Sequence, residues 1–335
     1  MRFSRQLDTY VREMSYGKVS LAVEVTQKWY MMPDKVGRYK ISPRNLEVDK
    51  SRVRKLIDDA LDAVDRDVDV SQYAFIALFM ASAMEEYGMV GLCGYPGMLG
   101  WSTEGALKTR SGKPVKGVAI FCYQAHLGTL FHDIAHILGG VKDGKRMVPC
   151  LYDHDLQAKP GPLRETFVNS LVNMGFWDPM SCHFRERGVG PPGISSWTKM
   201  RLNWMDQSKV KLVQPGEEAE IVLGPLEDGS SQVMAVKLPI SATTYYLIED
   251  RQQIGFDRGL PGSGVLIMYA DDNTPECRQG RAPVKLVNAD PSVPNLDGAA
   301  FDVGKRDSFE DKANRVSIRL REKVGSSYKV LVSRR

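Results

Sequence analysis

The sequence predicts a mixed α/β (α+β) domain over residues 1–208, followed by an all-β sandwich over residues 209–335. In the first part, candidate strands alternate with candidate helices, which is typical of a sheet that helices cover. From about Val210 onward, short runs of β-forming residues recur between turns, which is typical of a sandwich. We therefore place the boundary near Ser208.

The first candidate elements lie before residue 81. Val19–Trp29 alternates apolar and polar residues and is rich in Val, which predicts a strand. Ser51–Val64 has apolar residues at helical spacing, and either Asp49 or Ser51 is suited to cap that helix. Tyr73–Met80 predicts a buried strand.

The remaining elements of this part surround a glycine-rich stretch. Gly88–Trp101 holds five Gly and one Pro, which predicts a loop. Gly117–Tyr123 predicts a strand, and the mostly apolar Leu127–Leu138 predicts a buried helix. Leu163–Met174 and Ser195–Met205 also have helical patterns.

The C-terminal part contains six short β-rich runs. Asp-Gly, Pro-Gly and Asp-Asp-Asn sequences between some of them supply turns. The predicted strands are Ala219–Leu223, Gln232–Leu238, Thr244–Glu249, Gly264–Tyr269, Arg315–Leu320 and Tyr328–Val332. Most of these runs are closely spaced, which favours two antiparallel sheets.

The apolar helix carries the sequence His132-Asp133-Ile134-Ala135-His136. Histidines at i and i+4 lie on one helical face, close enough for both imidazoles to bind one zinc ion. The sequence is one substitution from the zinc-protease signature H-E-x-x-H, with Asp133 in place of the Glu. The alternative is a hydrogen-bonded core histidine pair, but three of the five His, namely His126, His132 and His136, fall within eleven residues, which favours metal binding.

Composition sets the general class of protein. The hydrophobic fraction of 43% and the charged fraction of 26% are those of an ordinary globular protein. The net charge of +4 is spread without a dense basic block, so we expect no nucleic-acid partner. No run of eighteen apolar residues occurs, so we expect no membrane span.

The cysteines and the N-terminus bear on the compartment. Met1–Tyr10 lacks an apolar core and does not look like a signal peptide. The five cysteines are scattered and form no C-x-x-C pair, so we expect mostly reduced thiols. Both features favour a cytoplasmic protein, although a secreted chain trimmed to its mature form would look the same.

Several segments together show a resemblance. The chain resembles the immune inhibitor A family of zinc metallopeptidases, a metzincin-like group whose members are secreted by bacteria. The matching segments occur in family order: Tyr10–Lys18, His132–Gly139, Leu151–Asp155, Trp177–Ser181, Pro191–Lys199, Tyr245–Gln252 and Gly255–Pro261. The ordered set is more specific than any one of them.

The resemblance implies a metzincin-like catalytic domain followed by a β-sandwich, with a protein or peptide as substrate. His132 and His136 would be zinc ligands, and Met180 would be the methionine that packs beneath the metal site. Asp133 would act as general base and then general acid, and a metal-activated water would attack the peptide bond. His183 follows the methionine turn, where a donor to the oxyanion is expected; the other reading is an ordinary loop histidine.

The chain departs from the family pattern at two places. Asp133 is one methylene shorter than Glu, so its oxygens retract by up to about 1.5 Å, and a misplacement of about 1 Å costs on the order of 10²-fold in rate. The third ligand is normally an Asp three residues after Gly139, but Lys142 stands there. Asp143 and Cys150 are the candidates that the two possible alignments give, with Cys150 favoured, and Asp153 and His154 are further alternatives.

Two other functional hypotheses remain beside the zinc peptidase. A relative that has lost catalysis would act as a binding or scaffold protein, and the sandwich would bind carbohydrate if it carried a flat aromatic platform. Asp153-His154-Asp155 and Asp271-Asp272-Asn273 have oxygen ligands of the kind that bind Ca²⁺, although turns use the same residues. The substrate sequence and the oligomeric state are not predicted.

Overall fold

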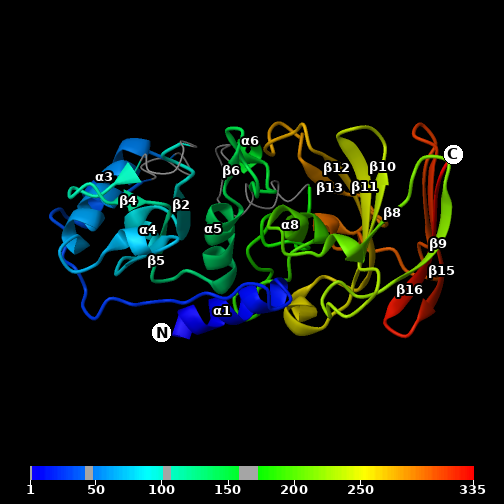
Figure 1. The fold of residues 1–335 in the computed structure, drawn as a ribbon, viewed down its shortest axis with the longest axis horizontal. Coiled ribbons are helices and arrows are strands. Elements are labelled where there is room, and N and C mark those ends of the chain that lie inside the picture. Colours follow the sequence, from blue (N-terminus) through cyan, green and yellow to red (C-terminus); the bar gives the residue numbers. More distant parts are fainter. Residues whose placement is uncertain (1, 42–47, 101–106, 158–172) are drawn as a thin grey trace. The chain divides into compact units, whose positions relative to one another are not determined.

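The structure is a computed structural model that describes residues 2–41, 48–100, 107–157 and 173–335 (Figure 1). The chain divides into two compact units. Among the described residues, unit 1 takes 2–7, 22–41, 48–100 and 107–148, and unit 2 takes 8–21, 149–157 and 173–335. The chain has a mixed α/β fold, and the boundary expected near Ser208 stays a prediction.

A three-stranded sheet forms the centre of unit 1. Its order is β1 (Ile76–Met80), β5 (Val118–Cys122) and β2 (Gly91–Tyr95), with β1 parallel and β2 antiparallel to β5. Helix α3 (Lys50–Val64) packs on one face, where its apolar side chains share a core with Leu92 and Tyr95 of β2 and with Val118 and Ile120 of β5. Helix α5 (Leu127–Gly139) contacts the same two strands from the other face.

Short elements complete the described part of unit 1. They are α2 (Val36–Tyr39), η1 (Val70–Gln72), α4 (Met84–Tyr87), β3 (Leu107–Lys108), β4 (Pro114–Val115), β6 (Val141–Lys142) and β7 (Lys145–Arg146). Strands β6 and β7 pair antiparallel and enclose a two-residue turn directly after α5. The N-terminal helix α1 (Arg2–Met14) begins in unit 1 and continues into unit 2.

Unit 2 contains two larger sheets that share one core. The first has the order β13-β12-β11-β10-β8, and the second has the order β14-β15-β16-β9. Their bounds are β8 Val210–Leu212, β9 Glu218–Leu223, β10 Ala235–Pro239, β11 Thr244–Arg251, β12 Gly264–Asp271, β13 Val284–Leu286, β14 Ser308–Asp311, β15 Val316–Val324 and β16 Ser327–Arg334. Apolar side chains from both sheets meet in a single buried cluster, as a sandwich requires.

Helical elements of unit 2 are short. They are α6 (His154–Gln157), α8 (Ser196–Arg201), η2 (Gln207–Lys209), η3 (Gly255–Gly259) and η4 (Pro294–Leu296). Ser195 caps α8 by accepting a hydrogen bond from the Thr198 amide. Tyr245 and Tyr246 are adjacent in β11 and are only 4% and 5% exposed, so the two rings form no flat aromatic platform on the surface.

Most predicted elements are present. Helix α3 is capped by Asp49, whose side chain accepts from the amides of Ser51 and Arg52. All six predicted C-terminal strands occur as β9, β10, β11, β12, β15 and β16. Strands β8, β13 and β14 were not predicted, because three or four residues are too short to show a period. The helix expected at Leu163–Met174 lies mostly outside the described residues.

Two predictions are wrong. Val19–Trp29 forms no strand, because within the described ranges no neighbouring strand pairs with it, and Val23, Val25 and Trp29 are exposed. The stretch from Gly88 to Gly100 is not only a loop, because it contains β2. The glycines of β2 lie where other groups approach the strand closely, which is a common reason for glycine inside a strand.

No helix within the described ranges has the length and apolar character needed to cross a bilayer.

Candidate metal centre

Helix α5 presents the two histidines of the motif. His126 caps its N-terminus, where the ring nitrogen Nδ1 accepts a hydrogen bond from the Gly128 amide at 3.1 Å. Every residue from Gly128 to His136 is buried, so the helix is held by apolar packing along its length.

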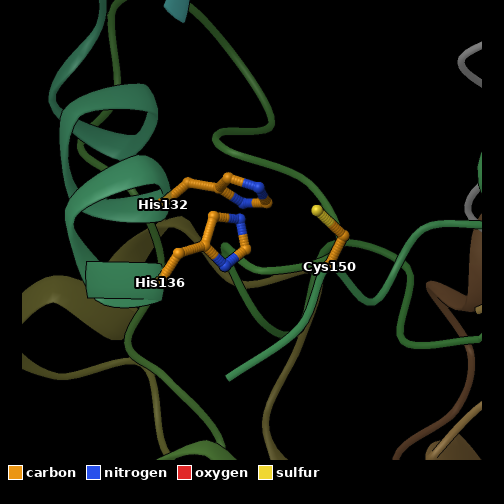
Figure 2. Close-up of side chains that lie close together, drawn as sticks. All are labelled: His132, His136 and Cys150. Atoms are coloured by element: carbon orange, nitrogen blue, oxygen red, sulfur yellow. The ribbon is translucent and has the colours of Figure 1, made fainter. Parts of the chain in front are cut away.

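His132 and His136 extend from the same face of α5 (Figure 2). Their ring centroids are 4.7 Å apart and the ring planes are at 84°. The two side chains are 2% and 1% exposed. This is the geometry expected of residues one helical turn apart, and it directs both imidazoles toward one point.

The orientation of His136 is fixed by one of its ring nitrogens. Its Nδ1 lies 2.7 Å from the carbonyl oxygen of Val148, so Nδ1 carries the proton and donates to that oxygen. In the neutral imidazole, the other nitrogen, Nε2, then carries the lone pair that can bind a metal ion. A backbone carbonyl behind a ligand histidine is the usual arrangement in metal sites.

Cys150 completes a buried group with the two histidines. The ligand atoms of His132, His136 and Cys150 all lie within 4.8 Å of one another, and Figure 2 shows the sulfur facing both rings. Ligand atoms around one tetrahedral zinc lie roughly 3.5 Å apart, so small movements close the group around an ion. Two imidazoles and a thiolate are ligands that zinc binds well, so this group could hold a metal ion.

The other candidate ligands lie elsewhere. Asp143 is exposed at a positive φ of 51° in the turn between β6 and β7, and it is outside the His132–His136–Cys150 group. Asp153 is buried, but its two oxygens accept hydrogen bonds from the amides of Asp155 at 3.0 Å and Gly280 at 2.7 Å. Asp153 therefore stabilises a turn. Of the two interpretations of the Asp153-His154-Asp155 cluster, calcium binding or a turn, this contact pattern fits the turn.

The second candidate calcium cluster is also a turn. Asp271 accepts from the amide of Asn273 at 3.0 Å and from the hydroxyl of Thr274 at 2.9 Å. Asp272 pairs with Arg201 at 2.7 Å. Among the described residues, the histidine–cysteine group is the only set of three His, Cys, Asp or Glu ligands close enough to share an ion.

Asp133 points away from solvent toward β2. The residue is 6% exposed, and its Oδ2 has no hydrogen-bond partner among the described residues. Burial raises the pKa of this carboxyl to about 8, against the opposing effects of the Arg146 charge and the Cys93 amide. An orphaned buried oxygen is uncommon in folded proteins and is more frequent at functional sites.

Gly91 in β2 makes room for this carboxyl, a role that was not predicted. A Cβ at Gly91 would lie 2.5 Å from Asp133 Oδ2 and 2.6 Å from Thr129 Cγ2. Only glycine therefore allows α5 to lie this close to the sheet. A glycine among apolar residues is the sequence feature that could have indicated this close contact. Because other glycines surround Gly91, the same residue also fitted the loop that the stretch predicts.

The segment Trp177–Ser181 of unit 2 is held by Asp178. The Oδ1 atom accepts from the amide of Met180 at 2.8 Å, and Oδ2 accepts from the amide and hydroxyl of Ser195 and the hydroxyl of Thr198. Met180 is fully buried, and its carbonyl accepts a 2.8 Å hydrogen bond from the amide of Leu151. His183 follows this turn and is half-buried.

The comparisons with known proteins give no family. Neither a family model nor a curated protein matches this sequence.

Proposed function

We propose that this chain is a zinc-dependent metalloendopeptidase-like protein. The observation that carries the proposal is the buried His132–His136–Cys150 group, in which two histidines one turn apart face a thiol. The acidic residue between the histidines gives the motif its hydrolytic character. The resemblance to the immune inhibitor A family and its metzincin-like catalytic domain is part of the same proposal.

The proposal assigns a role to each of these residues. His132, His136 and Cys150 hold the ion, and three protein ligands leave a fourth position open. A bound zinc ion would supply a Lewis acid that activates water and polarises a peptide carbonyl. Asp133 takes a proton from that water and delivers it to the leaving amine. His183 as an oxyanion donor stays a prediction.

Metal content tests the ligand set. Purified protein should contain equimolar zinc, and His136→Ala should lose it. His154→Ala is the matched control, because His154 lies outside the histidine–cysteine group, and that variant should keep its zinc. Cys150→Ser should lose zinc while Asp143→Asn retains it, and the opposite pattern would make Asp143 the third ligand.

Activity tests the role of Asp133. Hydrolysis of an unstructured protein substrate should be measured with zinc-loaded wild type and with Asp133→Ala. If Asp133 is the base, the variant loses on the order of 10²-fold or more in rate while it retains zinc. Equal rates in the two proteins would remove Asp133 from the mechanism.

A second candidate function is a catalytically impaired relative that acts as a binding or scaffold protein. It is favoured by the surroundings of Asp133, whose carboxyl is buried against the backbone of β2 at Gly91. Asp133→Glu separates the two candidates. Proteolysis that appears only in this variant supports the impaired relative, and activity that Asp133→Ala abolishes supports the peptidase.

A further inference from the structure

Two of the five cysteines lie in the same region of unit 2. Cys150 is 3% exposed and Cys277 is fully buried. Neither of them forms a disulfide. Cys150 belongs to the metal group, whereas Cys277 is not part of it.

Backbone hydrogen bonds join the two chain segments that carry these cysteines. The amide of His154 donates to the carbonyl of Cys277 at 3.2 Å. The amide of Gly280 donates to Asp153 Oδ2 at 2.7 Å, and Asp153 is fully buried. These two bonds fix the segment after Cys150 beside the segment that begins at Cys277.

Asn173 contacts the segments of both cysteines. Its buried Nδ2 donates to the carbonyl of Leu151 at 3.1 Å, directly after Cys150, and its side chain also hydrogen-bonds to the thiol of Cys277. One side chain therefore touches Cys277 and the residue that follows Cys150.

We propose that Cys277 is the disulfide partner of Cys150, and that oxidation of this pair by a small peroxide withdraws the sulfur ligand from the metal group. The inference rests on the proposed function only in taking Cys150 as a metal ligand. It adds a redox modification site that controls whether the metal is held.

The chemistry balances with hydrogen peroxide as the oxidant. The Cys150 thiolate attacks one peroxide oxygen, the O–O bond breaks, and hydroxide leaves and is protonated to water; Cys150 becomes a sulfenic acid. The Cys277 sulfur then attacks the Cys150 sulfur while its thiol proton leaves with the sulfenic oxygen as a second water. One S–S bond forms, two thiols are oxidised, and one peroxide is reduced to two waters.

Burial decides which oxidant fits and which cysteine reacts first. A peroxide is small enough to reach a thiol that is 3% exposed, whereas a tripeptide disulfide is not. Cys150 reacts first because its sulfur is the metal-ligating thiolate, the nucleophilic form. Cys277, which is fully buried, acts as the resolving cysteine.

The experiment follows metal release and disulfide formation in the full chain treated with hydrogen peroxide. Wild type should release its zinc, and a non-reducing peptide map should show a Cys150–Cys277 disulfide. A dithiol reductant with added zinc should restore the original zinc content. Cys277→Ser should bind zinc before treatment, but its Cys150 should proceed to the sulfinic acid, so that reduction restores no zinc.

Matched variants test whether the effect is specific. Cys182→Ser removes another buried thiol of unit 2, whose sulfur lies 3.3 Å from the Phe184 carbonyl, and should behave like wild type. Cys277→Ala replaces Cys277→Ser if the serine variant fails to fold. Absence of the mapped disulfide, or full recovery of zinc in the Cys277 variants, would overturn the proposal.

This test can be separated from the proposed function. If the protein binds no zinc, the proposed function fails, but the peptide map still decides whether peroxide joins Cys150 to Cys277. If the protein binds zinc and hydrolyses nothing, the release and recovery of zinc remain measurable.

Discussion

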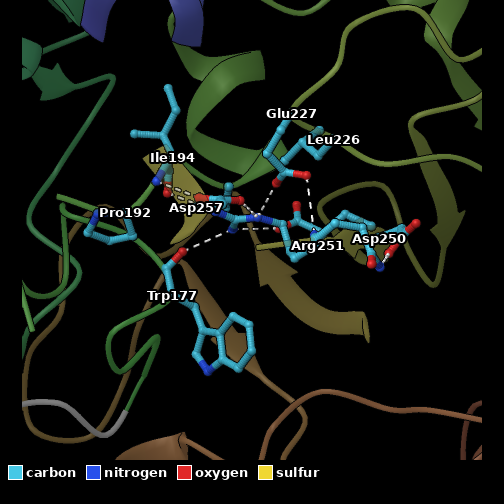
Figure 3. Close-up of polar contacts among 12 residues, drawn as sticks. Trp177, Pro192, Ile194, Leu226, Glu227, Asp250, Arg251 and Asp257 are labelled. Carbon is cyan, nitrogen blue, oxygen red and sulfur yellow. Dashed lines mark hydrogen bonds and ion pairs between the residues drawn. The ribbon is translucent and has the colours of Figure 1, made fainter. Parts of the chain in front are cut away.

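Two buried ionisable side chains, one from each unit, have opposite hydrogen-bonding environments. In unit 2 the fully buried Arg251 uses its three nitrogens in six hydrogen bonds, as Figure 3 shows in part. In unit 1 the Oδ2 atom of buried Asp133 has no partner among the described residues. A satisfied buried network holds a fold together, whereas an unsatisfied group has capacity left for a ligand.

The acceptors around Arg251 come from several segments of unit 2. They are carboxylates of Glu227, Glu249 and Asp257 and the carbonyls of Trp177 and Gly193. Two of these carboxylates also bind the backbone before and at the start of α8. Glu249 accepts a hydrogen bond from the Ser196 amide at 2.7 Å, and Asp257 accepts one from the Gly193 amide at 2.6 Å. One guanidinium thus ties β11 to the chain before α8 and to the turn at Trp177.

Opposite charges meet in this cluster. Burial and the neighbouring Asp257 raise the pKa of Glu227 well above its ordinary value. Arg251 and the buried Lys199 are the cations that face Glu249 and Asp257. Lys199 donates to the Met14 carbonyl at 2.7 Å, which adds the end of α1 to the same network.

The largest effect should come from breaking this cluster. Arg251→Ala leaves buried carboxylates without their counter-charge, so we expect the free energy of unfolding to fall by about 3–5 kcal/mol. Denaturant unfolding measures the loss. Arg12→Ala is the control in the same unit, because Arg12 pairs with Asp8 at the surface and such pairs contribute about 0–1 kcal/mol. Similar losses in the two variants would contradict the comparison.

The next effect is a pH dependence at Asp250, which adjoins Arg251 in β11 but has an orphaned oxygen. Its Oδ1 accepts from Gln252 at 2.6 Å, and Oδ2 has no partner among the described residues. Burial raises its pKa from 3.8 to about 7. A raised carboxyl pKa means that the folded state binds the extra proton, so stability is full below 3.8 and is lost as the pH rises toward 7.

Asp250→Asn should remove this dependence. Relative to the variant, wild type should lose up to roughly 1.4 kcal/mol of unfolding free energy per pH unit across that window, measured by denaturant unfolding at a series of pH values. Asp8→Asn is the control, because the pKa shift of Asp8 has the opposite direction and so does its effect on the pH dependence of stability. The hydrogen bond from Arg12 lowers the pKa of Asp8, so its contribution is present above 3.8 and is lost as the pH falls. If the unfolding free energies of wild type and Asp250→Asn change with pH in the same way, Asp250 is not the cause of the pH dependence.

Local signals predicted much of the fold because local physics determines those elements. Helix α3 has both an apolar face and a capping Asp49, and the six strands of the sandwich have their own β-rich runs. Val19–Trp29 has an equally good strand pattern, but pairing depends on a partner from elsewhere in the chain. The unpaired segment shows that alternation is necessary for a strand but not sufficient.

The candidate site was predicted in part for the same reason. The spacing of His132 and His136 is a property of one helix, so the pair could be recognised in the sequence. Cys150 was one of several candidates, and the loop geometry that favours it over Asp143 has no local signature. The hydrogen bonds from Asn173 to Leu151 and from His154 to Cys277 join residues far apart in the chain and could not be predicted.

The smallest effect that we predict is at Gly91, where β2 meets Asp133. A Cβ placed there would be 2.5 Å from Asp133 Oδ2 and 3.0 Å from a Phe121 ring carbon, so Gly91→Ala should cost about 1–3 kcal/mol of unfolding free energy. Gly37→Ala in α2 is the control, because its Cβ would meet no atom within 4 Å. In the Asp133→Ala background the cost of Gly91→Ala should shrink, since the shortened side chain removes one of the clashing atoms. If the cost is unchanged in that background, the clash of a residue-91 Cβ is with Thr129 and Phe121 alone. The Asp133 carboxyl would then not be the reason that residue 91 must be glycine.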